Sequence, residues 1–451
     1  LKLLLKEAHI INPVAKIDHP FWASIAEELG MPIVYDVMDL HSGFKENSSD
    51  NLLKENDLLK KADIILSSSD YLSYQFRKYS SKMISFKNAG EYKHFAESSK
   101  KLKAIPTDIK HLSGPVIGYY GALADWLNTD LIEQLAKDFP HASIVLIGLV
   151  NNSHLLSLAD KYPNIHLLGE KPYTELPKYL ARFDVCLIPF KLNKLIQATN
   201  PVKIYEYFAS GKPVVATSIP ELLPYKKLIY LADNPQSFSQ KVKQALAEKS
   251  VTLQQQRRKI AQSNTWQDRA AALEKHLLKV LYPKVSVVIL VYNHADLSEI
   301  SIDTTLQRSK YPNLEIIAVD NNSDQETLRM LQKYKQTKSV KLIFNQTNYG
   351  FAKGNNIGMQ AANGEYIILL NNDVRVTPGW IERLVYHAKG AKVGLVGPVT
   401  NSIGNESKIN IIYDPEDQAE VEEQAELYTY AHWGESLKLR NIAAFAWILP
   451  T

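Results

Sequence analysis

Short apolar runs alternate with amphipathic stretches along most of this chain of 451 residues. The runs have the length of buried strands, and the stretches between them carry apolar residues near the spacing of a helix. Strands that alternate with helices in this way usually form parallel sheets covered by helices. The pattern therefore predicts an α/β fold with mostly parallel sheets.

The apolar runs fall into three blocks, which we interpret as three domains. The first block covers 1–103, the second 104–281 and the third 283–451, with the sequence LYPK at 281–284 as the linker before the third. In the first two blocks we expect strands at 9–12, 32–39, 62–69, 82–90, 116–121, 143–149, 165–169, 184–190, 212–218 and 228–233. In the third block we expect strands at 284–293, 314–320, 341–345, 365–373, 393–398 and 443–451.

The composition indicates the cellular compartment and argues against a nucleic-acid partner. Hydrophobic residues make up 45% of the chain and charged residues 22%, which is a normal globular balance. The net charge is only +4 and no dense basic tract is present, so we expect no nucleic-acid partner. Cys186 is the single cysteine, which fits a reducing compartment, and no apolar run is long enough to cross a bilayer. The sequence starts without methionine and stops within an apolar run, so we expect a piece of a longer protein, cut at both ends.

In the third block, three expected strands end on polar residues. In open parallel sheets, ligands bind beyond the carboxyl ends of the strands, so these residues would share one edge. Asparagine and aspartate also form turns for local reasons, and one such strand end alone would indicate little. The residues are Tyr292 and Asn293 at the end of the first strand, Asp320, Asn321 and Asn322 at the end of the second, and Asn371, Asn372 and Asp373 at the end of the fourth.

A glycine-rich stretch lies between two of these strands. Gly350, Gly354 and Gly358 recur every four residues, with Lys353 and Asn355 among them. The glycines either allow a helix to pack closely or let the backbone approach a phosphate beside Lys353. The spacing is not that of a Walker loop, and the sequence alone leaves both interpretations open.

The sequences VSVVILVYN, IIAVDNNSDQET and NYGFAKGNNIGMQAANGEYIILLNNDVRVTPGWIERLV together resemble family 2 glycosyltransferases, which have the GT-A fold. The third block is most similar to bacterial enzymes that add rhamnose and related sugars to surface polysaccharides. The resemblance implies that Asp320, with Asn322, Tyr292 and Asn293, contacts the nucleotide of the donor. It also adds Lys353, Gly354 and Asn355 to the donor site.

The family's DxD motif falls on Asn371, Asn372 and Asp373. By this resemblance the motif contacts the donor, and Asp373, with Asn371, binds Mg²⁺ or Mn²⁺ that bridges the donor diphosphate. Asn371 replaces the first acidic residue of the motif, which weakens the expected metal binding. The family's general base is a carboxylate further along the chain, which we expect beyond Thr451. The catalytic residue therefore stays unknown, and we expect this stretch to bind donor but to transfer sugar poorly.

The second block contains a glycine turn at Gly121 and, further on, Lys203 and Glu206 three residues apart on an expected helix. Taken alone, these features fit a plain strand–helix turn and a surface ion pair. The sequences FKNAGEYKHF, NPVKIYEYFASGKPVVAT and NTWQDRAAALEKHL, however, resemble GT-B glycosyltransferases near family 4. The resemblance implies that Glu206 binds the donor ribose and that Lys203 and Gly121 lie near the diphosphate.

Asn200 lies in the same donor-site segment and is expected to contact the donor. Many relatives carry two glutamates spaced E-x7-E, and Ala198 replaces the first of them here. GT-B enzymes usually need no metal, because a cation and a helix terminus balance the phosphate charge. In the first block, Asp36, Asp39 and His41 follow a strand, and His41 is a candidate catalytic residue or, alternatively, a structural loop histidine.

The two resemblances together imply a truncated GT-B module of two Rossmann-like domains followed by a truncated GT-A domain, that is, a bifunctional glycosyltransferase. Its donors would be UDP- or dTDP-sugars, and its acceptor a saccharide or lipid-linked precursor of a bacterial surface polysaccharide. We expect a cytoplasmic location, and lipid-linked acceptors would allow peripheral contact with the inner face of the plasma membrane. The alternative is a non-catalytic sugar-nucleotide-binding or scaffold protein. A nucleotide-sugar pyrophosphorylase and an NAD-dependent enzyme fit less well, because their glycine-rich loops are absent after the first strands.

Overall fold

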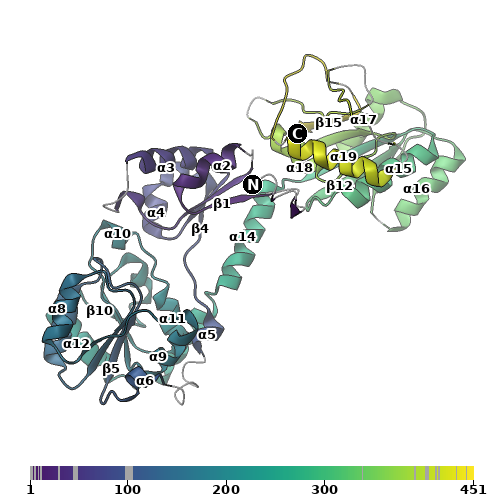
Figure 1. Ribbon diagram of the computed structural model, residues 1–451. Helices are drawn as coiled ribbons and strands as arrows, with labels where there is room; N and C mark the ends of the chain where they lie inside the picture. Colours follow the sequence, from purple (N-terminus) through teal and green to yellow (C-terminus); the bar gives the residue numbers. More distant parts are fainter. Residues whose placement is uncertain are drawn as a thin grey trace. The chain divides into compact units, whose positions relative to one another are not determined.

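The computed structural model describes residues 1–451 except 1–3, 5–6, 9, 11–12, 29–30, 44–48, 97–104, 338, 391–392, 402–405, 412–413, 415–416, 433 and 443. Of the strand expected at 9–12 only Ile10 is described, and it is not in a strand, whereas the domain boundary expected at 103–104 lies outside the described residues. The chain forms two compact units. One consists of Lys16–Ala23 and Val34–Glu274, and the other of Leu1–Ala15, Ser24–Ile33 and Lys275–Thr451. The described residues contain three sheets (Figure 1).

The first sheet has four strands in the order β1-β2-β3-β4, and β2, β3 and β4 are parallel. Every residue of β2 and β3 is buried, as expected for a parallel sheet with both faces covered. The strands are β1 (Ala15–Ile17), β2 (Ile33–Val37), β3 (Ile64–Ser67) and β4 (Met83–Ser85). The helices of this region are η1 (Pro20–Trp22), α2 (Ala23–Glu28), η2 (His41–Gly43), α3 (Ser49–Lys61), α4 (Asp70–Gln75), η3 (Arg77–Lys82) and α5 (Tyr92–Ala96).

The second sheet has six parallel strands in the order β10-β9-β8-β5-β6-β7. Asparagines at 128, 152, 193 and 234 cap four of its helices by accepting a backbone N–H, which explains why those helices begin where they do. The strands are β5 (Val116–Tyr120), β6 (Ser143–Ile147), β7 (Ile165–Leu167), β8 (Val185–Ile188), β9 (Val214–Ala216) and β10 (Tyr230–Leu231). The helices are α6 (Thr107–Lys110), α7 (Thr129–Asp138), α8 (Ser153–Lys161), η5 (Tyr173–Glu175), α9 (Leu176–Arg182), α10 (Lys194–Gln197), α11 (Lys203–Ser210), η6 (Pro220–Tyr225), α12 (Pro235–Leu246), α13 (Val251–Gln262) and α14 (Trp266–Leu281).

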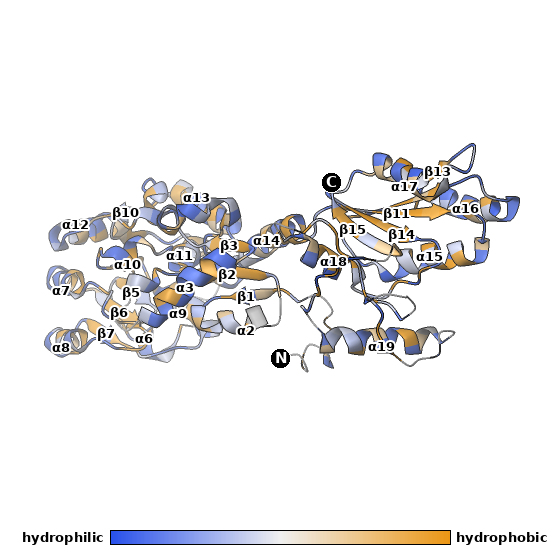
Figure 2. Cartoon of the chain, turned by 90° about the horizontal axis from the view of Figure 1, so that it is seen from above, coloured by the Kyte–Doolittle hydropathy of each residue, from blue (hydrophilic) through white to orange (hydrophobic). Residues whose placement is uncertain are grey.

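The third sheet has the order β13-β12-β11-β14-β15, with β15 antiparallel to β14 and the other pairs parallel. In Figure 2 the strands β11 and β15 are coloured as hydrophobic, whereas the helices carry both colours. The strands are β11 (Val285–Val291), β12 (Leu314–Asp320), β13 (Lys341–Phe344), β14 (Tyr366–Asn371) and β15 (Ala446–Pro450). The helices are α15 (Ala295–Arg308), α16 (Gln325–Thr337), α17 (Gly350–Ala361), α18 (Trp380–Ala388) and α19 (Gln418–Ala431).

Helix α17 packs closely on β11 and β12 because two of its glycines lack a side chain. A Cβ atom at Gly354 would lie 2.5 Å from Leu290 Cδ1, and one at Gly358 would lie 2.3 Å from Val288 Cγ1. The close-packing interpretation of these two glycines therefore holds.

The strand expected at 393–398 is wrong. The stretch forms a single bridge between Val396 and Ile448 of β15 and is otherwise irregular. Gly394 and Gly397 have no side chains to pack in a strand, and Pro398 has no N–H to donate to a neighbour, so a longer ladder is disfavoured. Within the described residues, no helix is both long and apolar enough to cross a membrane.

Candidate functional site

In the third sheet, the carboxyl ends of the central strands are level with one another. Val291, the last residue of β11, pairs with Asp320 at the end of β12. On the other side of β11, Leu290 pairs with Asn371 at the end of β14. The segments that begin at Tyr292, Asp320 and Asn371 therefore share one edge, as the sequence predicted.

The loops after β11 and β12 are joined by hydrogen bonds. Asn293 Oδ1 accepts from the backbone N–H of Asp324 at 2.9 Å, and the Asn293 N–H donates to Ser323 Oγ at 3.0 Å. Asp320 is buried, and its two carboxylate oxygens accept the N–H groups of Asn322 and Ser323, each at 3.2 Å. Asp320 thus shapes its own loop in addition to any ligand contact, and Tyr292 is exposed beside it.

Backbone strain is concentrated at this edge. Asn293, His294 and Asn322 have φ angles of 53°, 53° and 66°, and they are the non-glycine residues with positive φ among those described. Such conformations cost about 1–3 kcal/mol each and persist where the surrounding contacts fix them. Their position at the ends of β11 and β12 supports a ligand-binding role for this edge.

The side chain of Asn321, which follows Asp320 at the end of β12, fixes the start of α17. Its Nδ2 donates to Asn348 Oδ1 at 2.7 Å, and its Oδ1 accepts from Asn345 Nδ2 at 3.1 Å and from the Tyr349 N–H at 3.0 Å. Asn348 in turn accepts the N–H of Gly350, the first residue of α17, at 2.8 Å. Asn321 thus connects the end of β12 to the start of α17.

The residues of α17 named by the sequence differ in what they can reach. Lys353 is exposed, and its ammonium lies 3.9 Å from the centre of the Tyr349 ring. Asn355 is buried and donates to the carbonyl of Phe351 within the same helix at 3.0 Å, and Gly354 contacts the sheet. Lys353 is therefore the one of these three whose side chain is open to a ligand.

The Asn371–Asn372–Asp373 segment leaves β14 and is attached to α15. Asn372 Nδ2 donates to Ser298 Oγ at 2.8 Å, and the carbonyl of Asn371 accepts from Ser301 Oγ at 3.1 Å. Asp373 is exposed. Among the described residues, no group of three or more His, Cys, Asp or Glu could hold a metal alone. One exposed carboxylate next to an amide fits a hard cation that takes its other ligands from phosphates and water.

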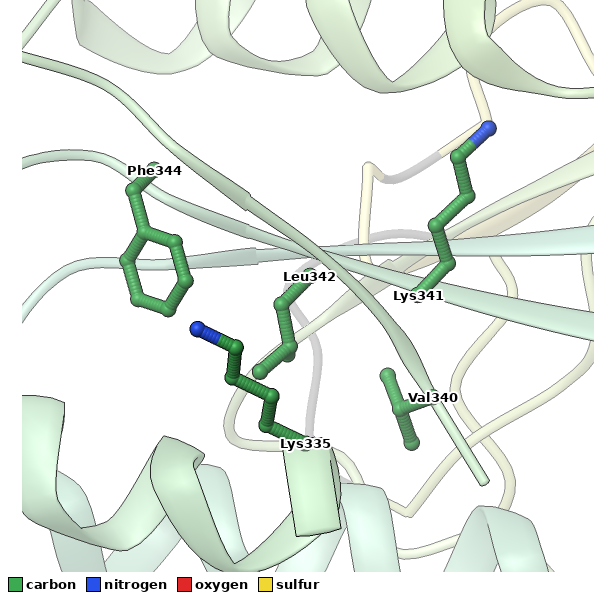
Figure 3. Close-up of a pocket in the computed structure, with 5 residues that line it drawn as sticks. All are labelled: Lys335, Val340, Lys341, Leu342 and Phe344. Atoms are coloured by element: carbon green, nitrogen blue, oxygen red, sulfur yellow. The ribbon is translucent and has the colours of Figure 1, made fainter. Parts of the chain in front are cut away.

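A cavity of about 420 Å³ opens beside the edge strand β13. It is lined by Lys335, Val340, Lys341, Leu342 and Phe344. In Figure 3 the ammonium of Lys335 points toward the Phe344 ring, whereas Lys341 extends the other way and donates to the carbonyl of Ala361 at 2.7 Å. The lining contains none of the predicted donor residues and no carboxylate, so this cavity is separate from the donor and metal site predicted from the sequence.

In the second sheet, Gly121 follows β5 and contacts the Lys203 side chain. Gly121 has a φ of 130°, and a Cβ atom there would lie 2.4 Å from Lys203 Cε and 2.5 Å from its Nζ. The Lys203 ammonium lies 5.5 Å from the centre of the Tyr119 ring. Burial lowers the pKa of Lys203, and the nearby Glu206 carboxylate opposes that shift. The structure thus brings Gly121, Lys203 and Glu206 together, as the sequence predicted.

Glu206 is only 5% exposed, so it cannot form the surface ion pair that the spacing alone allowed. Burial raises the pKa of its carboxyl, and Lys203 opposes the shift. The Tyr173 hydroxyl donates to Glu206 Oε1 at 3.4 Å, and the His94 ring stacks on Tyr173 with 5.0 Å between ring centres. Sequence reasoning missed Tyr173 and His94, because nothing in the local pattern connects them to Glu206.

Asn200 and His41, two further residues predicted for the site, contact other side chains of the protein. The Asn200 side chain donates to Glu221 Oε2 at 2.9 Å and accepts from the Tyr205 hydroxyl at 3.4 Å, so both of its polar ends are bound within the protein. His41 lies in η2, with its ring centre 5.4 Å from that of His19. Burial, and secondarily His19, lowers the pKa of His41.

Two glycosyltransferase sequence profiles match this chain. Residues 114–248 match Glycosyl transferases group 1, and residues 286–436 match Glycosyl transferase family 2. The first match covers the second sheet with Gly121, Lys203 and Glu206. The second covers the strand ends around Asp320 and Asp373.

Two relatives carry names from polysaccharide biosynthesis. A glycosyltransferase named for teichuronic acid biosynthesis, TuaH of Bacillus subtilis strain 168, is 27% identical over 255 residues, which are 52% of this chain and 64% of that protein. The O-antigen biosynthesis protein RfbC of Myxococcus xanthus is 34% identical over 117 residues, 26% of this chain and 9% of that protein. The chain thus spans less than two thirds of the length of either relative. Sucrose-phosphate synthase from Thermosynechococcus elongatus has a similar fold, with a TM-score of 0.51 at 15% identity over 61% of this chain and 75% of that chain.

The chain therefore carries two glycosyltransferase domains. A GT-B-type domain matching group 1 lies at residues 114–248, and a domain matching family 2 follows at residues 286–436. The expected fold class and the expected order of the two families are confirmed.

Proposed function

We propose that this chain transfers sugars from nucleoside-diphosphate sugars to a saccharide or lipid-linked acceptor in the synthesis of a bacterial surface polysaccharide. The observation that carries the proposal is the shared edge at the ends of β11, β12 and β14, which presents Asp320, Asn371 and Asp373 within the family 2 match. The names of the two relatives in teichuronic acid and O-antigen biosynthesis support this acceptor class.

In the family 2 domain, we propose that Asp320, Asn322, Tyr292 and Asn293 bind the nucleotide of a UDP- or dTDP-sugar. Lys353 at the exposed start of α17 would lie along the diphosphate, and Asp373 with the Asn371 amide would hold Mg²⁺ or Mn²⁺ there. When bound, such an ion supplies positive charge for the departing diphosphate. Asn372, which is bonded to Ser298, orients this segment against α15.

In the GT-B module, the same charge compensation falls to the protein alone. We propose that Lys203, held over Gly121, binds the diphosphate and that Glu206 accepts hydrogen bonds from the ribose hydroxyls. Burial raises the pKa of Glu206, and a buried carboxyl with a shifted pKa is common at ligand-binding sites. No metal is required for this step. The single cysteine supports the cytoplasm as the location, with peripheral contact at the inner face of the membrane where the acceptor is lipid-linked.

A second candidate function is donor binding without transfer. Ala198, which is buried, stands where many relatives have the first of two glutamates, and this absence favours the alternative for the GT-B module. Release of nucleoside diphosphate from a panel of UDP- and dTDP-sugars, with an acceptor extract and with or without Mn²⁺, distinguishes the two. Saturable release supports transfer, and donor binding without release supports the alternative. If the chain shows neither binding nor release, both candidate functions are contradicted.

A further inference from the structure

A buried carboxylate joins the part of the chain around the first sheet to the part around the second. Glu221 is 4% exposed and lies at the start of η6, after β9. Its Oε1 accepts the N–H of Asp70, the first residue of α4, at 2.7 Å. Its Oε2 accepts from Asn200 Nδ2 at 2.9 Å and lies 3.0 Å from the Lys87 ammonium. One carboxylate therefore binds groups from three separate segments.

The connection between the two parts of this unit passes through the same cluster. Lys87 and Asn88 lie in the segment that leaves β4 and leads toward the second sheet. Lys87 Nζ also lies 2.9 Å from Asp70 Oδ2, and Asn88 Nδ2 donates to the carbonyl of Asn200 at 2.7 Å. The carbonyl of Lys87 accepts from Arg269 Nε at 2.9 Å. We call the set of Asp70, Lys87, Asn200 and Glu221 the Glu221 junction.

The Glu221 junction is continuous with the proposed donor site of the GT-B module. Asn200 is three residues before Lys203 and six before Glu206 in the sequence. Tyr205, next to Glu206, donates its hydroxyl to Asn200 Oδ1 at 3.4 Å. A Cβ atom on Gly90, at the end of the connecting segment, would lie 3.0 Å from Tyr205 Cβ and 3.5 Å from the Glu206 N atom. Tyr205, near the start of α11, is therefore close to both the junction and the connecting segment.

We infer that Glu221 is a positioning residue that latches the two parts of the GT-B module together and, by holding Asn200, fixes the start of α11 for donor binding. The second half of this inference rests on the proposed donor site at Lys203 and Glu206. Opening the junction would separate Glu221 from Asp70 and Lys87 while leaving Asn200 bonded. The latch therefore favours one arrangement of the two parts, and a ligand that prefers this arrangement gains apparent affinity from it.

A purely structural role makes a different prediction. If Glu221 only stabilised the fold, its removal would lower the unfolding temperature without changing the arrangement of the two parts or the affinity for nucleotide. The test therefore needs a distance and an affinity, both measured on the full chain.

The distance is measured by pulsed electron spin resonance between spin labels at Lys60→Cys in α3 and Lys243→Cys in α12, both exposed positions. Cys186 is fully buried, so the labels go to the introduced cysteines. UDP affinity is measured by calorimetry on the unlabelled chain without divalent metal, so that the proposed metal-dependent site at Asp373 does not contribute. The variants are Glu221→Ala, Glu221→Gln and Lys87→Met, with Glu170→Gln as a matched control because Glu170 is an exposed carboxylate of the same part.

We expect Glu221→Ala to broaden the distance distribution and to weaken UDP binding by about tenfold or more. Glu221→Gln, which keeps an acceptor for Asp70 but loses the charge toward Lys87, should fall between Ala and wild type, and Glu170→Gln should match wild type. If Glu221→Ala does not fold, Lys87→Met takes its place, because a substitution at this partly exposed site is easier to tolerate. Lys87→Met alone should broaden the distance distribution.

Unchanged distances in the folded variants would overturn the latch. Broadened distances with unchanged UDP affinity would overturn the coupling to α11. If wild type itself binds no UDP, the proposed donor site fails, and the distances alone then decide the latch.

Discussion

Substitution of Gly121 tests the proposed diphosphate site of the GT-B module most sharply. Its φ of 130° is a backbone conformation that residues with side chains rarely adopt, so Gly121→Ala should cost about 1–3 kcal/mol of folding free energy. The new Cβ would also lie 2.5 Å from Lys203 Nζ, about 1 Å closer than van der Waals contact allows. The Lys203 ammonium must therefore move away from the turn. A hydrogen bond to a charged group contributes about 1.5–3 kcal/mol, so UDP affinity should fall about 10- to 100-fold.

Two other glycines of the same part provide controls for this substitution. Gly169 has a φ of 66°, and nothing lies within 4 Å of a Cβ built on it, so Gly169→Ala should show backbone strain of about 1–2 kcal/mol and unchanged UDP affinity. A Cβ on Gly148 would lie 2.1 Å from the carbonyl oxygen of Gly121, which is backbone and cannot swing away, so Gly148→Ala should destabilise most.

Calorimetric titration with UDP in the absence of divalent metal, together with thermal unfolding, separates strain from ligand binding in all three variants. Gly121→Ala should lose both stability and affinity, whereas Gly169→Ala should lose stability alone. If Gly121→Ala binds UDP as tightly as Gly169→Ala does, Lys203 does not serve the diphosphate and the proposed site is wrong.

Three further predictions concern stability. Arg257 is fully buried, and its two terminal guanidinium nitrogens each lie 2.6 Å from a carboxylate oxygen of Glu248. Arg257→Met should therefore destabilise the protein by about 3–5 kcal/mol in denaturant unfolding, and adding Glu248→Met should recover most of that loss. Equal losses in the single and double variants would contradict this. Gly358→Ala should cost about 1–3 kcal/mol, because its Cβ would meet Val288, and a neutral result in thermal unfolding would show that α17 can move away from the sheet. Burial raises the pKa of Glu206, so its contribution to stability is full at acid pH and is lost as pH rises. Wild type should therefore lose stability relative to Glu206→Gln as the pH rises above about 4.3, the ordinary pKa of a glutamate, and a stability difference that does not change with pH would refute the shift.

Local sequence patterns were sufficient for most of the fold. Apolar runs located the strands of the second and third sheets, because buried parallel strands are apolar on both faces. The stretch at 393–398 was wrongly predicted to be a strand. Its apolar residues are typical of a strand, but Gly394 and Gly397 interrupt them and have no side chains to pack. The polar strand ends could also be predicted, because topology brings the ends of parallel strands to one edge.

The contacts that connect distant segments could not be predicted. Tyr173 lies 33 residues from Glu206, and Glu221 lies 151 residues from Asp70, so no periodicity relates the members of either pair. Asn200 looked like a donor contact because of the segment in which it lies, yet its side chain is bonded to Glu221. Long-range hydrogen bonds follow from the packed structure and leave little trace in local residue order.

The most direct test of two donor sites on one chain is calorimetric titration of UDP and dTDP into wild type, Asp373→Ala, Glu206→Ala and the double variant, with and without Mn²⁺. We predict one binding event that requires Mn²⁺ and is lost in Asp373→Ala, and a second that needs no metal and is lost in Glu206→Ala. The double variant should bind neither nucleotide. Binding that survives in the double variant, or a metal-dependent event unaffected by Asp373→Ala, would contradict the assignment of the sites.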